Sequence, residues 1–73
     1  MKTDYPALFG QQIRAKRKER GLTIKALAQK AGIAHQNLWK IENGKYNPSL
    51  DYLALIAEAL GCKIVFVPKE DAL

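Results

Sequence analysis

Regularly spaced glycines set the strongest limit on how this chain can fold. They stand at positions 10, 21, 32, 44 and 61 of a sequence of 73 residues, so that short helices fit between most of them. A chain of this length holds one domain, which its own core stabilises only marginally and which often gains stability by forming oligomers. We therefore expect a single small domain built from short helices.

Apolar periodicity and capping residues place four helices between these glycines. The expected ranges are residues 7–20, 24–31, 35–43 and 50–60. Thr23 and Ser49 are good N-caps for the second and fourth helices, whereas Ala34 is a poor cap for the third. Gly32 permits the positive φ of a tight turn between the second and third helices. The pattern predicts a mainly α fold.

The period of the sequence changes after Gly61. Residues 62–67, CKIVFV, are rich in β-branched and aromatic side chains and are followed by Pro68, which predicts one β-strand. Alternate residues point to opposite faces, so both faces of this strand are apolar: Ile64 and Phe66 on one, Val65 and Val67 on the other. Because a single strand cannot satisfy its own backbone groups, we expect it to pair antiparallel with its copy in a twofold dimer. The alternatives are a strand that docks on a partner protein and a tail that folds back.

The charge is distributed unevenly. Residues 1–45 carry ten Lys or Arg against three acids, a balance of +7, and residues 46–73 carry two against four, a balance of −2. The basic part faces an anionic partner, of which nucleic acid is the obvious class, or is a heavily solvated surface. No apolar run is long enough to cross a bilayer and the start shows no signal-peptide pattern, so we expect a soluble, cytoplasmic protein.

Catalytic and metal-binding patterns are missing from the sequence. Cys62 is the single cysteine, which excludes an intrachain disulfide and a cysteine cluster for zinc. The chain has one histidine, no phosphate-cradling glycine loop and no nucleophile–base pair. We therefore expect no enzyme activity, no cofactor and no metal.

The second and third helices have the spacing of a helix-turn-helix. Ala28, Gly32 and Leu38 stand where that motif needs a small residue, a turn residue and a core apolar residue. If Leu38 and Ile41 point inward, the outward face of the third helix carries the following residues: His35, Gln36, Trp39, Lys40 and Asn43.

Four segments in this order resemble the Cro/C1-type (XRE) helix-turn-helix family of phage repressors and bacterial regulators: IRAKRKERGLT, KALAQKAGI, LWKIENGK and NPSLDYLALIAEALG. The resemblance covers about fifty residues, from Phe9 to Gly61. It implies a compact, lambda-repressor-like bundle of four or five helices, with the third helix in the major groove and symmetric dimers on operator DNA. It also implies that Arg17 and Glu42 form a structural ion pair between the first and third helices.

The resemblance implies base contacts for His35, Gln36 and Lys40. The chemistry agrees, because Gln pairs bidentately with adenine and Lys donates to guanine O6 and N7, although His35 could instead touch only phosphate. Trp39 is also expected at the bases, against a thymine methyl or a sugar; the alternative is an indole folded back on neighbours such as Tyr46.

Phosphate contacts are expected from helix starts and loops. The candidate residues are Thr23, Lys25, Asn37, Asn43, Lys45 and Asn47. Two positions depart from the family. Many relatives have a phosphate-binding Gln where this chain has Ile24, and Ser or Thr is usual where it has Ala34, so the docking angle on DNA is less defined.

Together these features predict a sequence-specific transcriptional regulator, a dimeric repressor that occupies a palindromic operator. Residues 1–61 would bind DNA and residues 62–73 would dimerise. The terminal strand is similar to that of HipB-like antitoxins, a branch of the same family. The alternative function is therefore the antitoxin of a type II toxin–antitoxin pair, which also binds a toxin protein and represses its own operon. A module whose basic face binds an acidic protein is a further alternative.

Overall fold

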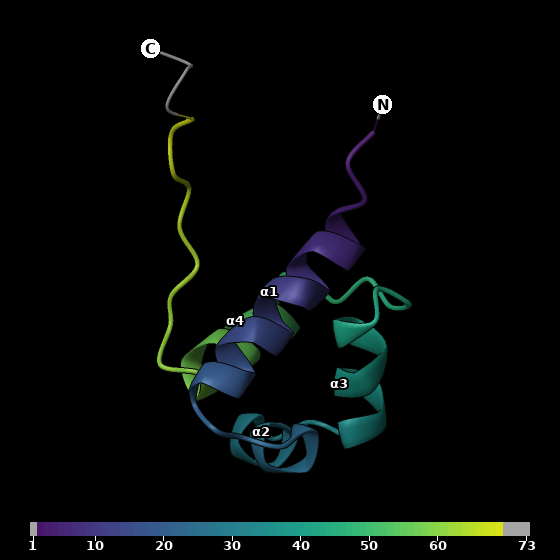
Figure 1. The fold of residues 1–73 in the computed structure, drawn as a ribbon, viewed down its shortest axis with the longest axis vertical. Helices are drawn as coiled ribbons and strands as arrows, with labels where there is room; N and C mark the ends of the chain where they lie inside the picture. The colour runs from purple at the N-terminus through teal and green to yellow at the C-terminus, as the bar shows by residue number, and fades with distance from the viewer. Residues whose placement is uncertain (1, 70–73) are drawn as a thin grey trace.

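The computed structural model describes residues 2–69, which contain four helices (Figure 1). These are α1 (Tyr5–Glu19), α2 (Ile24–Ala31), α3 (His35–Glu42) and α4 (Leu50–Ala59). Their bounds differ from the predicted ranges by at most two residues, and the mainly α class is confirmed. None of these helices is both long and apolar enough to span a membrane.

The predicted caps of α2 and α4 are present. The hydroxyl oxygen of Thr23 accepts a hydrogen bond from the backbone N–H of Ala26 at 3.0 Å, and that of Ser49 accepts from Tyr52 N–H at 3.1 Å. Each bond satisfies a backbone donor that has no partner within its own helix. Gly32 ends α2 with φ 74°, in the left-handed conformation that a side chain disfavours.

The start of α1 lies earlier than predicted. Asp4 is its N-cap, with a carboxylate oxygen that accepts from Ala7 N–H at 3.1 Å, and the helix begins at Tyr5. Pro6 stands in the first turn, where its missing N–H removes no hydrogen bond. The Asp–Tyr–Pro run was therefore a start signal that the apolar pattern alone did not reveal.

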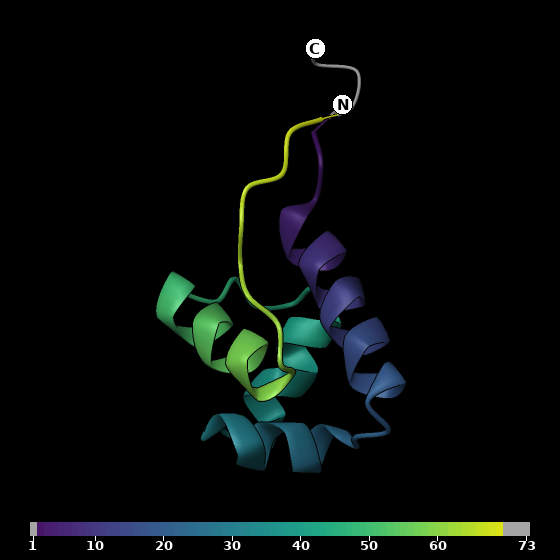
Figure 2. The same ribbon diagram turned by 90° about the vertical axis from the view of Figure 1, so that its left-hand side faces the viewer.

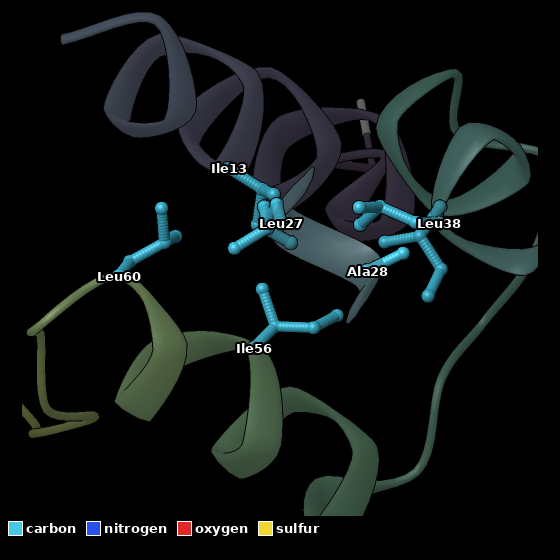
Figure 3. Close-up of a cluster of buried hydrophobic side chains, with 7 residues drawn as sticks. Ile13, Leu27, Ala28, Leu38, Ile56 and Leu60 are labelled. Atoms are coloured by element: carbon cyan, nitrogen blue, oxygen red, sulfur yellow. The ribbon is translucent and has the colours of Figure 1, made fainter. Parts of the chain in front are cut away.

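The core lies between the four helices. Side chains from all of them meet there (Figure 3), and the buried members are Ile13, Leu27, Ala28, Leu38, Ile41, Ile56 and Leu60. Leu27, Leu38, Ile41 and Ile56 are fully buried. α3 is thus packed on its inner side by the residues that the helical pattern had placed there.

The helices α1 and α3 approach each other closely at Gly10. A Cβ atom at this position would lie 2.3 Å from the carbonyl oxygen of Ile41 and 2.7 Å from that of Glu42. Only hydrogen fits in this space, so the glycine in the middle of α1 sets how closely the backbone of α3 is held.

The prediction of a β-strand at residues 62–67 is wrong for the single chain. Within residues 2–69 the segment after α4 forms no strand, and it leaves the helices as an irregular tail (Figures 1 and 2). Strand assignment requires a neighbouring strand to share hydrogen bonds, and the described part of the chain offers none. The side chains of Ile64, Val65, Phe66 and Val67 are exposed.

Candidate nucleic-acid interface

α2 and α3, joined by a short turn, form a helix-turn-helix at one end of the domain (Figure 1). Ala28 is buried at 2% exposure, which lets the two helices approach closely, and Leu38 and Ile41 hold the inner side of α3 in the core. The outer side of α3 is left free for a partner.

An ion pair joins α3 to α1. The guanidinium of Arg17 donates from Nε to Oε2 of Glu42 at 2.7 Å and from Nη2 to Oε1 at 3.0 Å, and its Nη1 donates to the carbonyl oxygen of Leu22 at 2.9 Å. The Glu42 side chain is fully buried and that of Arg17 is 11% exposed. This is the pair that the family resemblance implied. Its two parallel hydrogen bonds fix the guanidinium and carboxylate planes relative to each other.

Arg14 completes this arrangement, and the sequence analysis missed it. Its Nε lies 3.4 Å from Oε1 of Glu42, and its Nη2 donates to the side-chain oxygen of Asn43 at 3.2 Å. Glu42 ends α3, where the negative end of the helix dipole disfavours a carboxylate, and the two arginines offset that effect. The signal was available: Arg14 lies one turn before Arg17 on the same face of α1.

The outward face of α3 is open to solvent. His35, Gln36, Trp39 and Lys40 are all exposed, with Trp39 at 48%. They follow one another around the helix opposite Leu38 and Ile41. The four residues predicted to read bases therefore share one accessible surface.

Three of the predicted phosphate ligands already make hydrogen bonds within the chain. The amide of Asn37 donates to the hydroxyl of Tyr52 at 3.0 Å, which ties the first turn of α3 to α4. The amide of Asn43 donates to the carbonyl oxygen of Trp39 at 2.8 Å. The Thr23 oxygen caps α2, as described above. These side chains hold the motif in shape, and their remaining donor and acceptor positions are what DNA could use.

The other three predicted phosphate ligands stand free on the surface. Lys25, Lys45 and Asn47 are exposed, and no side-chain hydrogen bond of theirs occurs within residues 2–69. Lys25 lies at the start of α2, and Lys45 and Asn47 lie in the loop after α3, so a cationic group stands at each end of the helix-turn-helix in sequence.

The two departures from the family pattern have visible effects. Ile24 is partly buried and packs against the core, so its side chain belongs to the domain interior. Ala34 occupies the N-cap position of α3 with φ −71° and ψ 136° and provides no side-chain hydrogen bond. The amide groups at the start of α3 are consequently uncapped by a side chain.

Comparison with known proteins agrees with this geometry. A model of a family described as helix-turn-helix matches residues 13–67. The chain is 45% identical to the immunity repressor protein of Bacillus phage phi105 over 88% of its own length and 44% of the repressor, and 38% identical to the HTH-type transcriptional regulator SinR of Bacillus subtilis over 78% and 52%. It thus spans about half the length of these relatives.

Solved structures share the same arrangement of helices. The restriction-modification controller protein C.AhdI from Aeromonas hydrophila superposes with a TM-score of 0.80 at 30% identity, over 84% of this chain and 92% of that one. The family model covers well over half of the chain, and the region that it matches contains the helix-turn-helix formed by α2 and α3. The chain therefore belongs to the Cro/C1-type helix-turn-helix family.

Proposed function

We propose that this protein is a sequence-specific DNA-binding regulator of transcription, a repressor that inserts α3 into the major groove of its operator. The observation that carries the proposal is the contrast between the two sides of α3. Its inner side is buried and clamped by Arg17, whereas its outer side presents hydrogen-bonding side chains to solvent. A major groove admits one helix, and its base edges are read by such side chains.

Within this proposal the residues have two kinds of role. His35, Gln36, Trp39 and Lys40 contact base edges, and Lys25, Lys45 and Asn47 contact phosphates. Thr23, Asn37 and Asn43 contact the DNA phosphates with the side-chain donors and acceptors that their hydrogen bonds within the protein leave unused. The first group sets which sequence is bound, and the second sets how strongly any DNA is bound.

Selection of binding sites from random duplexes tests the proposal directly. We expect an enriched motif, followed by tighter binding to that motif than to scrambled duplex at fixed salt concentration. A protein that shows no enrichment, and equal affinity for motif and scramble, would not be a sequence-specific regulator. An acidic protein would then become the better candidate partner of the basic face.

We propose further that residues 1–61 bind DNA and that residues 62–73 join two copies of the chain. The tail leaves the domain on the side opposite α3 (Figures 1 and 2). Its apolar side chains at 64–67 are exposed, and its backbone lacks a neighbouring strand within the described chain. Antiparallel pairing of two tails would supply that strand and cover apolar surface without obstructing α3. Half-sites would then lie about one helical turn, ~34 Å, apart.

Removal of residues 62–73 tests this arrangement. We expect the truncated chain to sediment as a monomer with an unchanged helical spectrum and to bind the selected operator far more weakly than the full chain. A truncated chain that remains dimeric would refute pairing through the tail.

The same exposed tail favours a second candidate function, that of a HipB-like antitoxin whose tail also contacts a toxin protein. A toxin gene adjacent to the gene for this chain would direct the test. The encoded toxin should co-elute with the full chain and fail to co-elute with the chain that lacks residues 62–73. Retention of the complex after truncation would exclude the tail as the binding site.

A further inference from the structure

Trp39 is the one large aromatic side chain on the otherwise polar outer face of α3. It is 48% exposed and lies between the exposed polar residues His35 and Gln36 on the helix surface. An indole left half in water retains apolar area that a partner can cover. The question is which partner chemistry fits an apolar group at this place.

The indole has no aromatic neighbour in the described part of the chain. Tyr46, the residue on which it was free to fold back, instead packs edge to face on Tyr52, with ring centroids 6.3 Å apart. The rings of Tyr46 and Tyr52 thus pack on each other, and the exposed ring of Trp39 stacks on neither of them.

The backbone beneath Trp39 is held firmly. Its carbonyl oxygen accepts from the Asn43 amide at 2.8 Å, and Arg14 in turn donates to Asn43 at 3.2 Å. Trp39 lies about 60° around the helix from Gln36. Asn37, roughly on the opposite flank, is bonded to α4 through Tyr52. One flank of the outer face is therefore fastened to the domain, and the other presents the indole.

Base edges in the major groove offer few apolar targets. Guanine, adenine and cytosine present hydrogen-bond donors and acceptors, and burying those against an indole leaves them without partners. Thymine alone presents a methyl group, at C5. We propose, on the basis of the DNA-binding function above, that Trp39 packs on a thymine C5-methyl group in each half-site and so selects thymine at that position. A deoxyribose has similar apolar chemistry but carries no base identity, so the test must separate the two.

Deoxyuridine provides this separation, because it differs from thymidine by that methyl group alone. In the selected operator, each thymine is replaced singly by uracil, symmetrically in both half-sites. We expect replacement at one position per half-site to weaken binding about fourfold per methyl contact, the equivalent of about 0.8 kcal/mol. The variant Trp39→Ala should bind the thymine and uracil operators equally at that position, and Trp39→Phe should retain the preference.

The outcomes are distinct. Uracil replacement that weakens Trp39→Ala as much as the unaltered protein would overturn the proposal, as would an operator in which no replacement matters. A sugar contact would appear as an equal loss by Trp39→Ala on every sequence, with no response to uracil. Absence of any sequence preference in the unaltered protein would instead refute the proposed function. Because Trp39 lies outside the core, circular dichroism should show native helix content for both variants.

Discussion

Replacement of Gly10 by alanine tests whether the contact between α1 and α3 is as close as the structure shows. In an ordinary helix interior this change stabilises by about 0.5–1 kcal/mol, because glycine loses more backbone entropy on folding. Here the new methyl would lie 2.3 Å and 2.7 Å from two backbone oxygens of α3, where ordinary contact needs about 3.4 Å or more. The two helices must separate by roughly 1 Å, and neither oxygen can rotate away.

The cost of such overpacking is typically about 1–3 kcal/mol and exceeds the gain in helix propensity. We expect a net destabilisation of about 1–2 kcal/mol, which in a domain of this size lowers Tm by about 4–16 °C. Thermal melts at a fixed chain concentration measure the effect, since an oligomer's Tm depends on concentration.

Gln11→Ala is the matched control, because Gln11 is the exposed neighbour of Gly10 in the same helix. It should change the free energy of unfolding by less than about 0.5 kcal/mol. Operator affinity should fall with Gly10→Ala even well below Tm, because α3 is displaced, and should stay unchanged with Gln11→Ala. A Gly10→Ala variant whose Tm equals or exceeds that of the unaltered protein would refute the close approach of α1 and α3.

Three further predictions follow from the site. Glu42→Ala leaves the guanidinium of Arg17 largely buried without its carboxylate and should cost about 3–5 kcal/mol, so that urea melts show a largely unfolded domain; a loss below about 1 kcal/mol would contradict the buried pair. Ala34→Ser supplies the missing cap of α3 and should stabilise by about 0.5–1 kcal/mol, read as a higher Tm, and a lower Tm would contradict it. Gln36→Ala should cost about 1–3 kcal/mol of binding free energy on the selected operator and relax the preference for one base pair. Lys45→Ala should weaken binding to all sequences alike and reduce by about one the slope of log binding constant against log salt concentration. Equal losses for both variants on operator and random duplex would refute the division of roles.

Local signals predicted most of the fold. Thr23 and Ser49 cap the starts of their helices, and Gly32 ends α2, through hydrogen bonds to residues within a few positions along the chain. Because these bonds are local, the residues that make them can be recognised from the sequence. The prediction of a strand in the tail was wrong because a strand depends on a partner distant in sequence. Its β-branched residues favour extended backbone, but a strand exists only when another segment pairs with it, and residues 2–69 contain no such segment.

In the candidate site, too, the features set by local sequence could be predicted and those set by distant residues could not. The exposed face of α3 followed from helical period once Leu38 and Ile41 were taken as buried. The bonds of Arg14 to Asn43 and of Asn37 to Tyr52 join residues fifteen or more positions apart, and no local pattern announces them. The family resemblance provided the ion pair of Arg17 and Glu42, which composition and spacing alone do not specify.

The position of the tail relative to α3 has a consequence for how such proteins diverge. Since the two lie on opposite sides of the small helical core, a substitution on one surface makes no direct contact with the other. If the tail joins subunits and α3 reads the operator, as proposed above, duplicated genes can acquire new assembly partners while keeping the same target sites, or acquire new target sites while keeping the same partners. A hybrid chain that carries the last residues of a homologue should mix subunits with that homologue and still occupy its original promoter.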